Sequence, residues 1–320
     1  MIKNLKSVAK LLKKENSFLI VCHIDPDGDT IGSALGLKFV LNKLGKNVTV
    51  YSRDHIPKIY QFLPGISSIK QDLPQSKTFD VIISVDAGDV KRIGNAPSIL
   101  PRGKTLVNID HHPDNTYYGD LNLVEGVSCV AELIYKLAKE LKVKLDAKAA
   151  ICLYVAMMTD TGNFKYENTT AKTFGIAKDL VEAGADPSEA AIHVYEEKPF
   201  TAVAIHAFAA SHAKLAHGGK VIWSTIKRST MKKMHATDED LNGIVDKLRA
   251  VEGVEVAILI REHGKNQVKA NFRSKRRVNV QKIANKLGGG GHVRSSGAVI
   301  KGKIDAVEKK VIKTVLDQLK

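Results

Sequence analysis

The residues best suited to chemistry form a short acidic loop near the N-terminus, His23-Ile24-Asp25-Pro26-Asp27-Gly28-Asp29. The loop directly follows the apolar segment 18–22 and precedes a predicted helix. One imidazole and three carboxylates crowd this strand end, and like charges held close together disfavour ionisation unless cations neutralise them. For this loop taken alone, an Asp-rich turn that caps the helix is the simpler alternative.

Acidic and histidine residues recur after the next two predicted strands. Asp86 follows the apolar segment 81–85, and the triplet Asp110-His111-His112 follows the segment 105–109. A single aspartate after a strand is usually a turn or cap residue. The carboxyl ends of parallel strands, however, meet at one edge of a sheet, so three such strand ends predict a preformed metal site.

A fourth acidic residue, Asp160, ends the apolar helical segment 151–158. An ordinary helix-end residue is the alternative interpretation. A carboxylate at a helix C-terminus opposes the helix dipole, and a nearby cation would compensate for that. We therefore include Asp160 among the candidate metal ligands.

These residues need a scaffold that brings four distant segments together. Up to about residue 185, apolar segments typical of buried strands alternate with segments of helical periodicity, which favours an α/β domain with a mostly parallel sheet. An amphipathic helix carrying Ile2, Leu5, Val8, Leu11 and Leu12 precedes the first strand. The predicted strands are 18–22, 48–51, 81–85 and 105–109, and the predicted helices are 30–44, 129–142, 146–159 and 170–184.

A second α/β pattern begins near residue 220. It predicts strands at 220–227, 254–261, 267–273 and 297–301, and helices at 238–250, at 279–287 and at the C-terminus. We therefore predict a catalytic domain over 1–185, a helical linker over 186–215 and a smaller α/β domain with a mixed sheet over 216–320. Ligands of two-domain α/β proteins commonly bind between the domains, so we expect the active site in the interdomain cleft.

The composition is that of a folded protein, with 44% hydrophobic and 26% charged residues among 320. The formal net charge of +15 would attract phosphate-rich ligands, although a lysine-rich surface is more often plain solvation. Cys22, Cys129 and Cys152 lack Cys-x-x-Cys spacing, which indicates buried thiols in a reducing compartment. The longest apolar run, 151–158, is too short to span a bilayer, and no signal peptide is evident. We expect a soluble, cytoplasmic protein.

A glycine run near the C-terminus, Gly288-Gly289-Gly290-Gly291-His292, follows the predicted helix 279–287. One glycine would be an ordinary helix C-cap, but four exceed what a cap needs. Backbone N–H groups without neighbouring side chains can form an anion-binding nest. Arg273 and His292 would add charge-assisted hydrogen bonds to a terminal phosphate.

These motifs together resemble a known family. The set His23-x-x-x-Asp27-x-Asp29, Asp86, Asp110-His111-His112 and Asp160 resembles the four motifs of the DHH phosphoesterase superfamily. The glycine run, preceded by Asn271-Phe272-Arg273-Ser274, is similar to the DHHA1 substrate-binding domain. The resemblance covers nearly the whole chain. It is greatest to the NrnA-type branch of oligoribonucleases and 3′-phosphoadenosine-5′-phosphate (pAp) phosphatases.

The resemblance implies a role for each motif residue. One metal would be bound by His23 and Asp27, the other by Asp29, His111 and Asp160, and both would be bridged by Asp86. Behind them, Asp25 and Asp110 would orient their neighbours. His112 would contact the phosphate or protonate the leaving oxygen. Substrate binding would fall to Arg273, Ser274, Gly289, Gly290, Gly291 and His292.

The implied cofactor is a pair of Mn²⁺ ions, because mixed imidazole and carboxylate ligands suit manganese, with Mg²⁺ or Co²⁺ as substitutes. Two cations about 3.5–4 Å apart would lower the pKa of a bridging water and hold the phosphate for in-line attack. The implied activity is hydrolysis of short oligoribonucleotides to mononucleotides and of pAp to AMP.

Two other functions stay open. The first is a phosphodiesterase acting on cyclic di-AMP or on its linear product pApA. The second is a nucleotide-binding or RNA-binding protein without catalysis, although such a protein would be expected to have lost metal ligands. The sequence is compatible with a homodimer and does not decide the oligomeric state.

Overall fold

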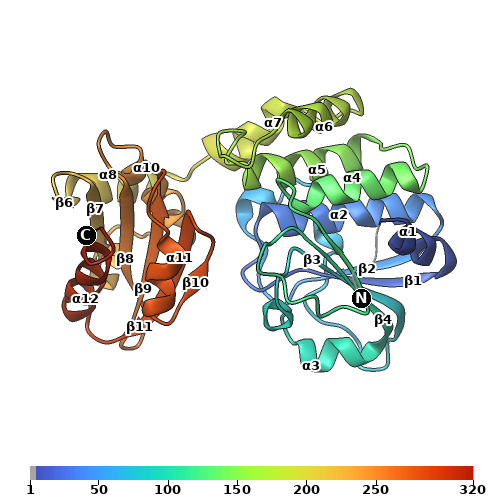
Figure 1. The fold of residues 1–320 in the computed structure, drawn as a ribbon, viewed down its shortest axis with the longest axis horizontal. Coiled ribbons are helices and arrows are strands. Elements are labelled where there is room, and N and C mark those ends of the chain that lie inside the picture. Colours follow the sequence, from blue (N-terminus) through green and yellow to red (C-terminus); the bar gives the residue numbers. More distant parts are fainter. Residues whose placement is uncertain (1–4, 320) are drawn as a thin grey trace. The chain divides into compact units, whose positions relative to one another are not determined.

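The computed structural model describes residues 5–319, so Ile2 of the predicted N-terminal helix lies outside the described residues. The chain divides into two compact units, Met1–Glu197 and Lys198–Lys320 (Figure 1). The predicted linker 186–215 contributes helices to both units. No helix in the described part of the chain is long and apolar enough to cross a membrane.

The N-terminal unit is built on a five-stranded sheet with the order β2-β1-β3-β4-β5. All neighbouring strands run parallel, which confirms the predicted sheet. The fifth strand was missed because it has only four residues and lacks a long apolar run. The strands are β1 (Ser17–Val21), β2 (Asn47–Tyr51), β3 (Phe79–Val85), β4 (Gly103–Asp110) and β5 (Leu121–Val124).

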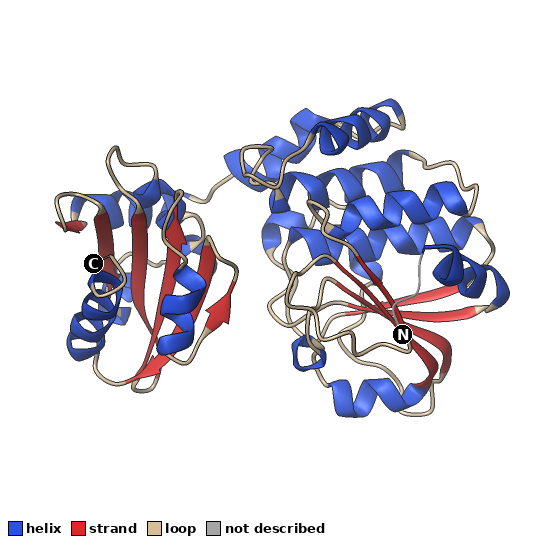
Figure 2. Cartoon of the chain, viewed as in Figure 1, coloured by secondary structure: helices blue, strands red, loops and turns tan. Residues whose placement is uncertain are grey.

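Helices cover both faces of this sheet (Figure 2). The larger core lies beneath α1, α2, α4 and α5, and a smaller apolar cluster lies on the other face beneath α3. The α-helices are α1 (Leu5–Lys14), α2 (Gly28–Lys43), α3 (Ala96–Ile99), α4 (Val130–Glu140), α5 (Ala147–Asp160), α6 (Ala171–Glu182) and α7 (Pro187–Ala191). A π-helix spans Ile192–Glu196, and short 3₁₀ helices span Lys58–Tyr60, Ile66–Ser68, Val90–Arg92 and Leu100–Arg102.

Helices α2 and α5 pack unusually closely because α2 presents glycine at every fourth position, Gly28, Gly32 and Gly36. A Cβ atom on Gly32 would lie 2.3 Å from the backbone oxygen of Cys152 on α5. A Cβ atom on Gly28 would lie 2.3 Å from the hydroxyl oxygen of Thr159. Small residues at this spacing let two helix backbones approach each other. The contact places the acidic start of α2 beside the end of α5.

The C-terminal unit contains a six-stranded sheet with the order β10-β11-β9-β8-β7-β6. Only β7 and β8 run parallel, so the predicted mixed sheet is confirmed. Two short strands, β6 and β10, were not predicted. The strands are β6 (Lys214–Ala216), β7 (Val221–Ile226), β8 (Val256–Gly264), β9 (Gln267–Ser274), β10 (Gly290–Gly291) and β11 (Ser295–Lys301).

Apolar clusters lie on both faces of the second sheet, one beneath α11 and α12 and the other beneath α8 and α10. The predicted helix 238–250 is wrong as one element. It is divided into a 3₁₀ helix, Glu239–Leu241, and α10, because Gly243 adopts a left-handed φ of 85° between them. The α-helices are α8 (Phe200–Ser211), α9 (Arg228–Lys233), α10 (Ile244–Arg249), α11 (Val280–Lys286) and α12 (Ile304–Leu316).

The close helix contact predicts opposite effects for two Gly→Ala substitutions. Gly32→Ala should lower the free energy of unfolding by about 1–3 kcal/mol, because the new methyl group overlaps the α5 backbone. Gly175→Ala, in the exposed middle of α6, should raise it by about 0.5–1 kcal/mol, because alanine favours the helix and nothing lies within 4 Å. Urea denaturation followed by circular dichroism measures both. A stable Gly32→Ala chain would contradict the close packing of α2 on α5.

Candidate metal centre

The sheet brings the predicted ligands to one edge. His23 lies two residues beyond β1, Asp86 directly follows β3, and Asp110 is the last residue of β4. These three strands are neighbours in the sheet, so their carboxyl ends lie side by side. Asp160 is the last residue of α5, which the glycine contact holds against α2.

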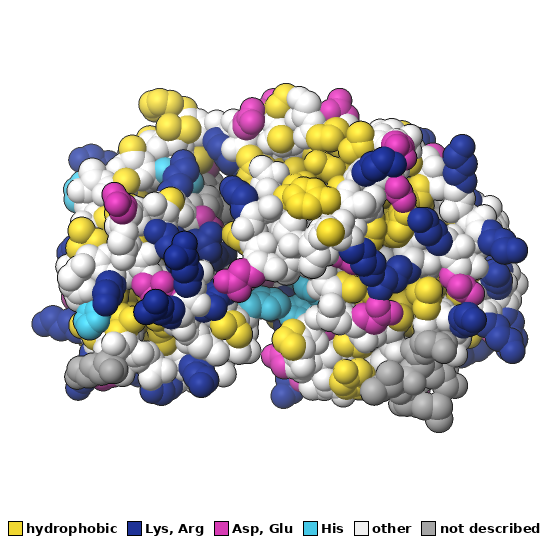
Figure 3. Space-filling view, turned by 45° about the horizontal axis from the view of Figure 1, so that its top comes forward, with side chains coloured by type: hydrophobic (Ala, Val, Ile, Leu, Met, Phe, Trp, Pro, Cys, Tyr) yellow, Lys and Arg dark blue, Asp and Glu magenta, His cyan; other side chains and the backbone are white. Residues whose placement is uncertain are grey.

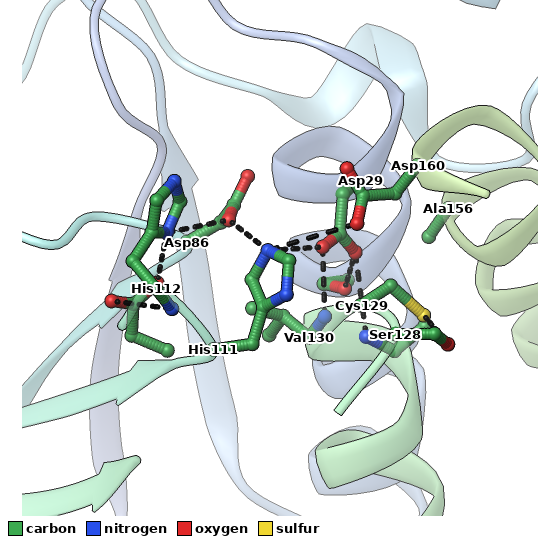
Figure 4. Close-up of polar contacts among 12 residues, drawn as sticks. Asp29, Asp86, His111, His112, Ser128, Cys129, Val130, Ala156 and Asp160 are labelled. Atoms are coloured by element: carbon green, nitrogen blue, oxygen red, sulfur yellow. Dashed lines mark hydrogen bonds and ion pairs between the residues drawn. The ribbon is translucent and has the colours of Figure 1, made fainter. Parts of the chain in front are cut away.

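Asp86 lies at the centre of the site, between histidines on either side (Figure 4). Its Oδ2 atom is 3.4 Å from Nε2 of His23. Its Oδ1 atom is 3.5 Å from Nε2 of His111 and 3.6 Å from Nδ1 of His112. A left-handed φ of 58°, which aspartate tolerates better than most residues, turns the side chain into this position. One carboxylate thus faces both halves of the site.

Within residues 5–319, the potential ligand atoms form three groups in which all atoms lie within 4.8 Å of one another. Two groups coincide with the sets predicted for the two metals, and Asp86 belongs to the first of them. The third group adds His112, which sequence reasoning placed beside the metals. The groups are His23–Asp27–Asp86, Asp29–His111–Asp160 and Asp86–His111–His112.

The geometry fits divalent cations. Among the described residues, Oδ1 of Asp86 and Oδ2 of Asp160 are buried without a hydrogen-bond partner. Buried carboxylate oxygens without a partner are unfavourable, and a cation would satisfy them. The donor set of imidazole nitrogens and carboxylate oxygens suits Mn²⁺ and similar ions.

The pKa values of the acidic groups reflect their crowding in the metal-free protein. Burial raises the pKa of Asp160 from 3.8 to about 7, and the charge of Asp86 adds to this. Burial, together with the charges of Asp86 and Asp160, also raises the pKa of Asp29 well above its ordinary value. Burial alone would raise the pKa of Asp86, but His111 and His23 beside it lower that pKa below its usual range.

The histidines respond in the opposite sense. Burial lowers the pKa of His23, but the charge of Asp27 and the hydrogen bonds to Asp27 and Asp86 raise it to about 10. For His111, burial is outweighed by Asp86, Asp160 and Asp29, and the pKa rises to about 11. Without metal, protonated imidazoles therefore neutralise the carboxylates. Cation binding would displace these protons, which makes metal affinity depend on pH.

Backbone carbonyl groups set the orientation of the two ligand histidines. Nδ1 of His23 lies 2.7 Å from the carbonyl oxygen of Ile24, and Nδ1 of His111 lies 3.2 Å from that of Val127. A carbonyl oxygen can only accept, so Nδ1–H donates in both rings and Nε2 faces the carboxylates. Such an outer hydrogen bond is the usual support of a metal-binding imidazole.

Two helix N-termini hold the aspartates of the acidic loop. Asp27 is the N-cap of α2, and its Oδ1 atom accepts hydrogen bonds from the amides of Asp29 and Thr30, both at 3.1 Å. Asp29 accepts from the amide of Val130, at the start of α4, at 2.7 Å. The hydroxyl of Ser33 donates to Asp29 at 2.9 Å. For Asp29, the hydrogen bond from Val130 at the N-terminus of α4 lowers the pKa and so partly offsets the burial that raises it.

The two aspartates predicted to orient their neighbours differ in their surroundings. Asp110 is fully buried, and its Oδ1 atom lies 2.7 Å from Nδ1 of His112. Its Oδ2 atom accepts from the side chain of Asn115 at 2.5 Å. Asp25 is exposed, and its backbone amide donates to Asp54 at 2.9 Å. The orienting role of Asp25 stays a prediction.

Several residues that support the site were missed by sequence reasoning. Asn115 bonds to Asp110, and Tyr118 donates to the Ser84 hydroxyl at 2.8 Å and lies 3.0 Å from the carbonyl oxygen of Ala87. Thr30 donates to the carbonyl oxygen of Val85, just before Asp86, at 3.2 Å. None of them belongs to a recognisable motif, so a single sequence carries no signal for them.

In the C-terminal unit, strand β11 lies between β9, which carries Arg273, and β10, which carries two residues of the glycine run. Arg273 pairs with Ser295 across β9 and β11, and Gly291 pairs with Ser296 across β10 and β11. Nε of Arg273 is 3.3 Å from Asp246. The Ser296 hydroxyl donates to the carbonyl oxygen of His292 at 2.6 Å.

The fold requires glycine at some positions of the 288–291 run and not at others. A Cβ atom on Gly289 would lie 2.1 Å from the carbonyl oxygen of Gly297, and Gly291 has a φ of 131°. These positions need glycine for packing. A Cβ atom on exposed Gly290 would meet no described atom closer than 3.7 Å, so packing does not require glycine there. Ser274 is buried, and its hydroxyl donates to Val278 at 2.7 Å, so its substrate contact remains a prediction.

The fold and the clustered ligands define a two-domain α/β protein with a candidate dinuclear metal centre. Residues 17–157 match the DHH family, N-terminal domain, and residues 218–320 match the DHHA1 domain. The chain belongs to the DHH family and carries a DHHA1 domain.

Relatives with assigned activities match nearly the whole chain. The chain is 30% identical to the bifunctional oligoribonuclease and PAP phosphatase NrnA of Thermus thermophilus, over 98% of this chain and 94% of the relative. It is 31% identical to the protein of the same name from Bacillus subtilis, over 87% of each. An exopolyphosphatase-related protein from Bacteroides fragilis shares the fold, with a TM-score of 0.91 and 24% identity over 98% of this chain and 95% of that chain.

The raised pKa of Asp160 predicts how the metal-free chain responds to pH. A carboxyl group whose folded pKa is raised stabilises the fold while it is protonated, and this stability is lost as the pH rises through the folded pKa. In EDTA, the free energy of unfolding should therefore fall between about pH 4 and 7, because the pKa of Asp160 is 3.8 in the unfolded chain and about 7 in the folded chain. For the Asp160→Asn variant, the free energy of unfolding should fall less steeply with pH than for wild type. At pH 8 the variant should therefore be more stable than wild type.

Urea denaturation at several pH values measures both slopes. The matched control is Asp305→Asn, which removes a carboxylate with 75% side-chain exposure from the C-terminal unit. It should leave the wild-type slope unchanged. Equal slopes for wild type and Asp160→Asn would contradict the raised pKa.

Proposed function

We propose that this chain is a two-metal-dependent phosphoesterase that degrades short oligoribonucleotides to mononucleotides and converts pAp to AMP. The observation that carries the proposal is the pair of ligand groups, His23–Asp27–Asp86 and Asp29–His111–Asp160, linked through the two oxygens of Asp86. The names of the NrnA relatives supply the substrates.

We propose Mn²⁺ as the natural cofactor, with Mg²⁺ or Co²⁺ as substitutes. The ligand set contains imidazole nitrogens, which Mn²⁺ accepts more readily than Mg²⁺ does. When bound, two such ions activate a water molecule near neutral pH and neutralise the charge on the phosphate in the transition state. Free, buried thiols at Cys22, Cys129 and Cys152 fit a reducing compartment, so we place the activity in the cytoplasm.

Residues of the chain supply orientation and a proton. Burial lowers the pKa of His112, but the hydrogen bond to Asp110 and the charges of Asp86 and Asp110 together raise it above its ordinary value. A protonated His112 can donate a proton to the leaving oxygen or a hydrogen bond to the phosphate. Nδ1 of His112 lies 2.7 Å from Asp110 and 3.6 Å from Asp86, so the hydrogen bond to Asp110 orients the imidazole beside the metal ligands.

The C-terminal unit fits the role of substrate binding through its charge. Residues 198–320 contain 25 Lys and Arg against 10 Asp and Glu, whereas residues 1–197 contain 24 of each. The whole net charge of the chain therefore lies in this unit, where Figure 3 shows Lys and Arg side chains gathered on the visible face. A cationic surface attracts polyanionic substrates, and Arg273, Gly290 and His292 would hold a terminal phosphate.

Loss of the central carboxylate should abolish hydrolysis. Asp86→Asn or His111→Ala should lower kcat by more than about a hundredfold, since even residues behind metal ligands matter by about 10–100-fold. The assay measures initial rates with Mn²⁺ on pAp, diribonucleotides, longer RNA, pApA, cyclic di-AMP and pyrophosphate. Asp305→Asn should retain the wild-type rates.

The substrate panel also separates the alternatives. Fastest turnover of diribonucleotides and pAp supports the proposal. Preference for pApA or cyclic di-AMP would replace it with a dinucleotide phosphodiesterase, and tight RNA binding without turnover would replace it with a binding protein.

The proposed phosphate contact predicts a separate effect in the C-terminal unit. Arg273→Ala should raise KM for pAp with a smaller change in kcat, because the residue binds the phosphate away from the reacting bond. Hydrogen bonds to charged groups contribute about 1.5–3 kcal/mol, so the expected rise is about 10- to 150-fold. Arg228→Ala removes the same charge from exposed α9 and controls for net charge. An equal rise in both variants would contradict a specific contact.

A further inference from the structure

A short segment at the start of α4 orients two ligands of one candidate metal position. We call residues 127–131 the α4 entry segment. The carbonyl oxygen of Val127 accepts the hydrogen bond from His111, at 3.2 Å. The amide of Val130 donates to Asp29 at 2.7 Å (Figure 4). The positions of His111 and Asp29 therefore depend on the same few residues.

Asn168 connects the third ligand of this position to the same segment. Its side-chain Nδ2 donates to the carbonyl oxygen of Ser128 at 2.9 Å and to that of Asp160 at 3.2 Å. One NH₂ group can donate both bonds, and an amide turned the other way would direct its oxygen at two carbonyl oxygens. Asn168 thus joins the end of α5, which carries Asp160, to the α4 entry segment.

Glu132 fixes the α4 entry segment from inside the protein. Only 2% of this residue is exposed, and its Oε1 atom accepts from the Ser128 hydroxyl at 2.5 Å and from the Ser128 amide at 3.3 Å. The Thr173 hydroxyl donates to the same oxygen at 3.2 Å. A buried carboxylate oxygen that accepts three hydrogen bonds in this way rigidifies the backbone that it contacts. Ser128 is therefore a firm anchor for Asn168.

The other candidate metal position is supported differently. Its histidine, His23, is oriented by the carbonyl oxygen of Ile24, and Asp27 is held by the N-terminus of α2. These contacts involve neither Asn168 nor the α4 entry segment. Support for the two positions is therefore separate, apart from the shared Asp86.

We propose that Asn168 is a positioning residue for the metal bound by Asp29, His111 and Asp160, and that it does not position the metal bound by His23 and Asp27. The inference rests on the proposed two-metal function. Without the Asn168 side chain, Asp160 loses its link to the backbone that orients the other two ligands. Changes behind metal ligands weaken binding by about 10–100-fold, and here the loss should fall on one ion only.

The experiment titrates Mn²⁺ into EDTA-stripped full-length chain by isothermal titration calorimetry and electron paramagnetic resonance. Wild type should bind two ions that are magnetically coupled through the shared Asp86. Asn168→Ala and Asn168→Leu should bind one ion with wild-type affinity and the second about 10- to 100-fold more weakly. In these two variants, the electron paramagnetic resonance spectrum should show the hyperfine signal of an isolated Mn²⁺ when one equivalent of Mn²⁺ per chain has been added. The leucine variant keeps most of the side-chain volume, so it separates the lost hydrogen bonds from a cavity.

The matched control is Asp146→Ala, which removes the N-cap at the opposite end of α5. It should lower the melting temperature of the metal-free chain, yet bind both ions as wild type does. Equal weakening of both ions in the Asn168 variants, unchanged binding of both, or the same one-ion loss in Asp146→Ala would overturn the inference. A wild-type chain that binds no Mn²⁺ would overturn the proposed function itself.

Discussion

The close contact between α2 and α5 is the constraint on which the candidate metal centre depends. Gly28, Gly32 and Gly36 have no Cβ atom where α2 faces α5, so the α2 backbone approaches the side chains of Thr159 and Leu153 and the backbone oxygen of Cys152. The acidic loop at the start of α2 and Asp160 at the end of α5 then lie at the same end of the helix pair. With larger residues at these positions the helices would separate, and Asp160 would move away from Asp29 and His111.

This packing has an electrostatic consequence. Asp29 and Asp160 are buried near Asp86, and their raised pKa values show that three carboxylates cannot all ionise easily there. Protonated His23 and His111 partly compensate in the metal-free protein. Such an arrangement reduces stability unless cations bind, which is the usual relation between a functional site and the fold that carries it. The tight helix packing supplies the stability that the site lacks.

The two units divide the proposed work by charge. The N-terminal unit has no formal net charge, and four of its aspartates, Asp27, Asp29, Asp86 and Asp160, belong to the candidate metal groups, where they would attract small cations. The C-terminal unit carries the entire excess of Lys and Arg, and its strand β11 lies between the glycine strand β10 and β9, which carries Arg273. A substrate with several phosphates would be repelled by bare carboxylates but attracted to this second unit. Separate binding surfaces for metal and for phosphate avoid direct competition between them.

The sequence by itself determined the central sheet and most of the ligand chemistry. Alternation of apolar segments and helical periodicity predicts the order of strands and helices. Parallel strands end at a common edge of the sheet, so the sequence alone predicts that His23, Asp86 and the 110–112 triplet lie close together. Short or interrupted elements were not predicted correctly. Strand β5 was missed because it has too few residues for a periodic signal, and the predicted helix 238–250 is divided at Gly243, although the neighbouring residues favour a helix.

The tertiary structure decided which residues support these ligands. Asn115 and Asn168 are polar residues in loops, and nothing in their local sequence distinguishes them from ordinary turn residues. Their roles arise from contacts across the fold, as when Asn168 reaches Ser128, 40 positions away in the sequence. The glycine spacing of α2 likewise acquires meaning only when α5 packs against it. Sequence periodicity encodes which face of an element is buried, whereas the distance between two distant side chains follows from how whole elements pack.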